Sequence, residues 1–217
     1  QIIKRGSGGN TKYDLFQRLN SNGSPLTSQE YRSCIMVMIN EPLFDKVVEF
    51  AADAKFRTVL RLDTDDTDKQ DDIDYACRYL THVAYEYESR DKDVDEFISD
   101  SIKRLFLEQS GAVPAFISTG QAVMHKLFDL YGADALRRFQ DGKPIGRAGR
   151  VGFETIVVGL AHNWPAIKKM KQLDEFVKSR IESLWNQRTV ADFTSPGTRG
   201  TDRIRKTVPF GKKWFAP

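Results

Sequence analysis

Apolar residues recur at intervals of three and four along most of this chain, which is the spacing of an amphipathic α-helix. One clear stripe consists of Val94, Phe97, Ile98, Ile102, Leu105 and Phe106. Similar stripes are found around residues 44–51, 75–85, 115–131, 153–160 and 173–185. No alternating strand pattern and no hairpin signal stands out. The sequence therefore predicts an all-α fold, an irregular multi-helix bundle of about eight to ten helices.

Glycine, proline and polar residues mark the predicted boundaries of this bundle. Residues 4–11 are rich in Gly, Ser and Asn, so residues 1–11 are predicted as strand and loop. Pro42 is well placed as a first-turn residue of a helix. Pro196, Gly197 and Gly200 interrupt the C-terminal stretch. The prediction is a helical domain over 12–188, followed by a basic loop or tail over 189–217.

The composition is that of an ordinary globular protein. The chain has 217 residues, of which 40% are hydrophobic and 29% charged, and its net charge of +3 does not by itself demand nucleic acid. Cys34 and Cys77 are too few and too widely spaced for a disulfide framework. No apolar run approaches the ~20 residues of a membrane span, and no signal peptide is visible. These features predict a cytoplasmic protein without a membrane partner.

The densest group of polar residues surrounds a predicted turn between two helices. Arg18 and Asn20 close the first helix, and the stretch from Thr27 to Glu30 spells a capping box that opens the second. Arg32 follows close to that helix start, where the helix dipole disfavours a cation. In one reading, Arg18 and Arg32 clamp a phosphate while Asn20 and Glu30 orient them. In the other, Glu30 and Arg18 simply pair and lock the turn.

This stretch resembles the helical segment of the GmrSD restriction-enzyme N-terminal-domain family, bacterial proteins with a ParB/sulfiredoxin-like core. The family occurs in modification-dependent and other anti-phage nucleases. Asn22 stands where the family usually has Gly, and Ser33 where it has Asn. The matching residues are Phe16, Arg18, Asn20, Gly23, Leu26, Gln29, Glu30 and Arg32.

The resemblance implies a role in DNA restriction and phage defence, with a nucleotide triphosphate and a divalent metal used by the complete protein. The family's catalytic Asp-Gly-Gln-Gln-Arg run is missing, because Asp141-Gly142 continues with Lys143-Pro144. The chain is therefore expected to be the helical half of such a protein, with residues 1–11 as the remnant of a ParB-like half. It is expected to hold no cofactor itself and to be inactive without that half. Arg18, Asn20, Glu30 and Arg32 would then brace the active site.

The C-terminal segment supplies a second candidate interface, because its basic residues greatly outnumber its acidic ones. The candidate DNA-binding residues are Arg199, Arg203, Arg205, Lys206, Lys212 and Lys213. The competing interpretation is a solvated tail that docks its aromatic residues on the core. If the segment does bind, the chain could also be a non-enzymatic DNA- or protein-binding adaptor.

Three further motifs carry weaker signals. The acidic run 63–74 lacks the glycine and terminal glutamate of a calcium loop, so a solvated helix flank is favoured over a metal site. His82, His125 and His162 have no cysteine partners at metal-ligand spacing, and no metal is predicted. Arg78 and His82 resemble the Arg-to-His pair of the HEPN ribonucleases, but the gap between them is shorter than in that family.

Overall fold

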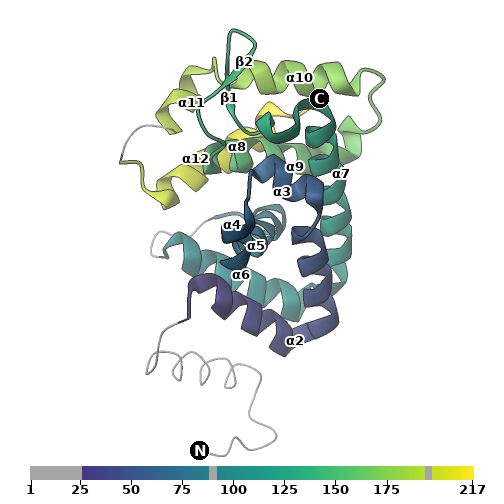
Figure 1. The fold of residues 1–217 in the computed structure, drawn as a ribbon, viewed down its shortest axis with the longest axis vertical. Helices are drawn as coiled ribbons and strands as arrows, with labels where there is room; N and C mark the ends of the chain where they lie inside the picture. Colours follow the sequence, from purple (N-terminus) through teal and green to yellow (C-terminus); the bar gives the residue numbers. More distant parts are fainter. Residues whose placement is uncertain (1–25, 88–91, 194–196) are drawn as a thin grey trace, which may run out of the picture.

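The structure, a computed structural model, describes residues 26–87, 92–193 and 197–217, and it is built almost entirely of helices (Figure 1). The predicted all-α fold is confirmed. The α-helices are α2 (Ser28–Ala51), α3 (Ala54–Leu60), α4 (Thr64–Asp68), α5 (Asp71–Ala84), α6 (Val94–Glu108), α7 (Val113–Tyr131), α8 (Arg150–Gly152), α9 (Val158–Ile167), α10 (Leu173–Leu184), α11 (Arg188–Phe193) and α12 (Gly200–Trp214). Short 3₁₀ turns η1 (Ser110–Ala112) and η2 (Gly132–Asp134) and a π-helical turn η3 (Phe153–Val157) complete the helical set.

The helices form two packed groups that share one long helix. Helices α2, α5 and α6 contact one another at the end drawn lowest in Figure 1. Helices α9 and α12 pack together with η3 in the upper half, where α10 and α11 also lie. Helix α7 runs along one side and contacts α2, α5 and α9, so it joins the two groups. None of the helices in the described part of the chain is long and apolar enough to cross a membrane.

Helix α2 contains a sharp break at Asn40, just before Pro42, which the sequence places in the first turn of a helix. Asn40 has non-helical dihedral angles (φ −159°, ψ 86°), and its side-chain oxygen accepts a hydrogen bond from the Leu43 amide at 3.1 Å. Asn40 thus acts as an N-cap in the middle of the helix. Pro42 follows in the first turn of the second half, where its missing N–H costs no hydrogen bond. The predicted position of Pro42 is confirmed.

The predicted basic loop or tail over 189–217 is wrong for most of its length. Helices α11 and α12 occupy much of it, and Phe215 is completely buried. Ile204 and Val208 lie four residues apart and face the core, which is the helical pattern that the prediction overlooked. Gly200 opens α12 instead of interrupting a helix.

A small hairpin was also missed. Strands β1 (Arg138–Gln140) and β2 (Lys143–Ile145) pair antiparallel, with Phe139 opposite Pro144. The loop between them is Asp141-Gly142, and both residues have positive φ angles, 51° and 72°. Asp-Gly with two positive φ angles is the signature of a type I′ hairpin turn. The signal was therefore present in the sequence, but the flanking strands are too short to show alternation.

Helices α9 and α12 approach closely because two glycines face each other. A Cβ atom on Gly159 would lie 2.5 Å from the carbonyl oxygen of Gly211, and one on Gly211 would lie 2.3 Å from that of Thr155. Both distances are too short for a non-bonded contact with backbone, which cannot easily move aside. The close packing of α12 on α9 and η3 therefore depends on the absence of side chains at these positions.

We expect Gly159→Ala to lower the free energy of unfolding by about 1–3 kcal/mol, because the added methyl must push two backbones apart. Chemical denaturation monitored by circular dichroism measures the change. Gly111→Ala is the matched control, since nothing lies within 4 Å of the added Cβ there. Equal denaturation midpoints for the two variants would contradict this account of the packing.

Candidate anion-binding site

A buried ion pair between Arg32 and Asp74 joins α2 to α5. The Arg32 side chain is 2% exposed and that of Asp74 is 7% exposed, and Arg32 Nη2 lies 2.6 Å from Asp74 Oδ1. Gln29, one turn earlier on α2, accepts a hydrogen bond from Arg32 Nε at 2.9 Å. These contacts explain how a cation is tolerated so close to a helix N-terminus. The carboxylate offsets the unfavourable interaction of Arg32 with the helix dipole.

Asp74 is the centre of a larger network, because it contacts three arginines. Its second oxygen, Oδ2, lies 2.6 Å from Arg78 Nε and 3.1 Å from Arg150 Nη1. Arg78 also reaches Asp95 at the start of α6, with a distance of 3.0 Å from Nη2 to Oδ1. The network therefore ties α2, α5, α6 and α8 together through charged hydrogen bonds.

Charge decides the protonation state of Asp74. Burial alone raises the pKa of its carboxyl, but Arg78, Arg150 and Arg32 outweigh burial and hold that pKa below its usual value. One donor of the network is left over. Arg32 Nη1 is buried without a hydrogen-bond acceptor among the described residues, and Asp95 Oδ1 lies 3.6 Å away from it.

Four residues, Arg18, Asn20, Glu30 and Arg32, are predicted to brace an active site, and the structure describes two of them. Arg18 and Asn20 lie outside the described residues. The capping box is present: the Glu30 amide donates to Thr27 Oγ1 at 3.2 Å, and Glu30 Oε2 accepts from the Thr27 amide at 2.7 Å. Glu30 thus caps α2, and Arg32 is buried against Asp74 instead of being open to a phosphate. Glu30 thus stabilises the start of α2, and Arg32 joins α2 to α5.

A cavity of about 660 Å³ lies on the other side of Arg150. It is open to solvent on one side and is lined by the hairpin and the loop after it, helix α8, the ends of α10 and α11, and the start of α12. Four arginines line it: Arg138, Arg147, Arg150 and Arg203. Among the described residues, none that lines this cavity is acidic. We call it the arginine cavity.

Two of the four arginines are held in place by buried carboxylates. Arg150 contacts Asp74, as described, and its guanidinium lies over the ring of Tyr75, 4.6 Å from the centroid. Arg203 on α12 makes a bidentate pair with Glu154, at 3.1 Å to Oε2 and 3.0 Å to Oε1. Both guanidinium groups are therefore fixed before any ligand arrives.

Glu154 occupies the π-helical turn η3, at the point where α12 crosses it. The side chain of Glu154 is 3% exposed and also accepts a hydrogen bond from Thr207 Oγ1 at 2.7 Å. A π-helical turn inserts an extra residue into a helix and is frequent at functional sites. Here the turn carries the Glu154 carboxylate, which orients the Arg203 side chain at the cavity wall.

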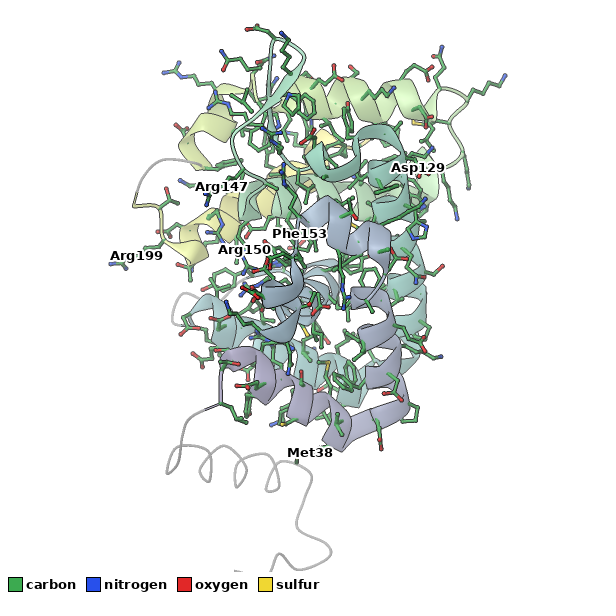
Figure 2. All side chains as sticks on the ribbon, in the orientation of Figure 1. Met38, Asp129, Arg147, Arg150, Phe153 and Arg199 are labelled. Atoms are coloured by element: carbon green, nitrogen blue, oxygen red, sulfur yellow. The ribbon has the colours of Figure 1, made fainter. Side chains whose placement is uncertain are left out.

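The other two arginines, Arg138 and Arg147, are exposed. Neither makes an ion pair with any residue in the described ranges. Figure 2 shows Arg147 and Arg150 on the same side of the molecule as Arg199, with Arg150 nearer the centre. The cavity thus combines two fixed inner arginines with two exposed outer ones.

The six predicted DNA-binding residues do not form one surface. Arg199, Arg203, Lys206 and Lys213 follow one another at helical spacing, so they share one side of α12, and of these only Arg203 lines the cavity. Arg205 and Lys212 lie on the opposite side, where Lys212 Nζ approaches Glu86 at 3.5 Å and Arg205 lies over the Tyr87 ring. The helix therefore divides the basic group in two.

The acidic run 63–74 and His82 contribute to the folded structure. The expected solvated flank over 63–74 is wrong for two residues, because Asp72 pairs with Arg57 at 2.6 Å and Asp74 with Arg32, and both carboxylates are buried. No group of residues suited to hold a metal occurs in the described part of the chain. Burial lowers the pKa of His82 to about 3, helped by the nearby arginines, so His82 stays neutral at physiological pH.

Three of the cavity arginines were not singled out from the sequence. Arg147 and Arg150 lie in the glycine-containing stretch 140–150, whose sequence predicts a loop, and Arg138 lies just before it, in residues 133–139, whose sequence predicts a helical turn or two. The available signal was the coincidence of arginine and glycine there, since glycine allows the backbone to turn and present neighbouring side chains together. Their meeting with Arg203 depends on the path of α12 and could not be inferred locally.

Comparisons with protein-family models, with curated proteins and with solved structures found no match to this chain. Any function must therefore be argued from the arginine cavity and the network beneath it.

We expect Asp74→Asn to lower the free energy of unfolding by about 3–5 kcal/mol at pH 7, because it removes the buried carboxylate that contacts Arg32, Arg78 and Arg150. The folded-state pKa of Asp74 is depressed, so its contribution is fully present above the unfolded-state pKa of about 3.9. That contribution is lost as the pH falls through the folded-state value, and the difference from wild type should shrink below about pH 4.

Urea unfolding of both proteins between pH 3 and pH 8 measures this difference. Asp65→Asn on α4 is the matched control, since Asp65 is exposed and makes no side-chain hydrogen bond or ion pair within the described residues. A pH-independent difference, or an equal loss in the control, would rule out Asp74 as the source.

Proposed function

We propose that this chain is a nucleic-acid-binding module that holds the phosphate backbone at the arginine cavity. The observation that carries the proposal is the meeting of four arginines around one cavity whose described lining contains no acidic side chain. Guanidinium groups match phosphate oxygens in shape and charge and bind them through two parallel hydrogen bonds. A cavity of this kind suits an anion better than a cation or a neutral apolar ligand.

The arrangement of the four arginines supports a phosphate ligand further. Arg150 and Arg203 are held by Asp74 and Glu154, so little side-chain entropy is lost when they bind. Arg138 and Arg147 are exposed and supply charge that buried carboxylates do not offset. The exposed Arg199, Lys206 and Lys213 lie on the same side of α12 as Arg203 and add basic groups beyond the cavity, with the exposed Asp202 among them.

Arg147→Ala should weaken binding to DNA and lower by about one the slope of log affinity against log salt concentration, because one phosphate contact is lost. Fluorescence anisotropy with a labelled oligonucleotide at several salt concentrations measures both quantities. Arg104→Ala is the matched control, since Arg104 is an exposed arginine on α6 that pairs with Glu108 away from the cavity. The proposal fails if wild-type affinity does not depend on salt, or if both variants bind alike.

The resemblance to the GmrSD family leads to a narrower proposal. In a nucleotide-dependent restriction or phage-defence protein, this chain would supply DNA contact and a rigid frame, and the ParB-like half would supply the chemistry. The burial of Arg32 supports the framing role, because a residue of the family pattern is used to join α2 to α5. The exposed arginines of the cavity support the DNA contact.

This narrower proposal predicts that the purified chain does not hydrolyse nucleotide triphosphates, with or without DNA, and that hydrolysis appears when a ParB-like half is added. Phosphate release is the measurement. If DNA stimulates hydrolysis by the combined halves, Arg147→Ala should reduce this stimulation and leave hydrolysis without DNA unchanged. Robust turnover by the chain alone would overturn the assignment of the chemistry to the other half.

A further inference from the structure

The arginine cavity has a second kind of wall, which a bare phosphate would not use. Trp185, at the C-cap of α10, and Phe193, at the end of α11, both line it. The apolar lining is completed by Leu136, Ile145, Val151 and Val190. Apolar and aromatic residues thus outnumber the arginines in the described lining, six to four.

Trp185 also carries an unused hydrogen-bond donor. Its indole Nε1 is buried and has no acceptor among the described residues, whereas Nε1 of Trp214 donates to the Arg180 carbonyl at 2.9 Å. A buried N–H without an acceptor is uncommon and costs free energy. The aromatic side chain at this wall is therefore not satisfied by the protein's own described groups.

The size and lining of the cavity together select a class of ligand. A volume of about 660 Å³ is typical of a site for a small organic molecule, and it is far larger than an inorganic anion needs. An aromatic ring that carries a phosphate would cover the apolar wall and meet the arginines at the same time. A nucleotide has both parts, and bases stack on aromatic side chains and on guanidinium planes.

We propose that the arginine cavity binds one unstacked nucleotide, with the base against Trp185 and the phosphate at Arg147 and Arg150. This inference rests on the proposed function and makes it more specific, because phosphate binding alone would not distinguish bases from a bare backbone. The nucleotide comes either from a single strand or from free solution. Both sources share the same chemistry of an aromatic base joined to a charged phosphate.

The decisive test compares two single-stranded oligonucleotides of equal length and phosphate number, one with bases and one with abasic sugars throughout. Fluorescence anisotropy should show about tenfold tighter binding of the base-bearing strand, within the range of one base–aromatic stack. Equal affinity of the two strands overturns the inference. If neither strand binds with salt-dependent affinity, the proposed function itself fails, so the two failures are distinguishable.

Variants at Trp185 locate the effect. Trp185→Leu should abolish the preference for the base-bearing strand and leave the affinity for the abasic strand unchanged. Trp185→Phe keeps an aromatic ring and should therefore retain most of the preference for the base-bearing strand. Circular dichroism melting confirms that each variant is folded, and the comparison of strands by the wild-type protein needs no variant at all. An undiminished preference for bases in folded Trp185→Leu would place the base elsewhere and overturn the inference.

A competition arm separates the two sources. Displacement of the base-bearing strand by millimolar nucleoside monophosphate, but not by the same concentration of inorganic phosphate, supports a free nucleotide as ligand. Displacement by neither, with the preference for the base-bearing strand intact, supports a nucleotide within a strand. Equal displacement by the nucleoside monophosphate and by inorganic phosphate shows that the base adds nothing and overturns the inference.

Discussion

The carboxylate of Asp74 is the constraint on which the rest of the structure depends. Three guanidinium groups from three helices converge on its two oxygens, and the two most buried of them, those of Arg32 and Arg78, would be costly to bury without it. Arg32 is 42 residues away along the chain and Arg150 is 76, so a single side chain joins α2 and α8 to α5 across long stretches of sequence. Charged hydrogen bonds of defined geometry thus add to the apolar packing between these helices.

The arginine cavity follows from this constraint. Arg150 faces Asp74 with one nitrogen and lines the cavity with the rest of its side chain. Glu154, on the π-helical turn, plays the equivalent part for Arg203, which also lines the cavity. The cavity thus lies next to a buried network of ion pairs, and Arg150 and Arg203 belong to both. The ion pairs that hold the helices together therefore also position the side chains of the candidate site.

The sequence predicts the helices well and the site poorly, for a physical reason. Apolar periodicity, the capping box from Thr27 to Glu30 and Pro42 are local signals, and each describes a local structure that is present. The burial of Asp74 is not local, because nothing near it in the chain distinguishes it from its exposed acidic neighbours. Its burial depends on arginines brought in by other helices. The same holds for Arg138 and Arg147, whose position opposite α12 depends on the tertiary path.

The two layers of arginine have a consequence for the ion atmosphere around this protein. The charge of Arg203 is offset by the buried carboxylate of Glu154, and that of Arg150 is offset in part by Asp74, which Arg32 and Arg78 also contact, so both attract fewer counterions than an unpaired arginine would. Arg138 and Arg147 are exposed and keep their full field in solvent. In the proposed binding, the inner pair would determine the orientation in which an anion is held, whereas the outer pair would determine from how far it is attracted. Long-range attraction and short-range geometry are thus assigned to different residues of one cavity.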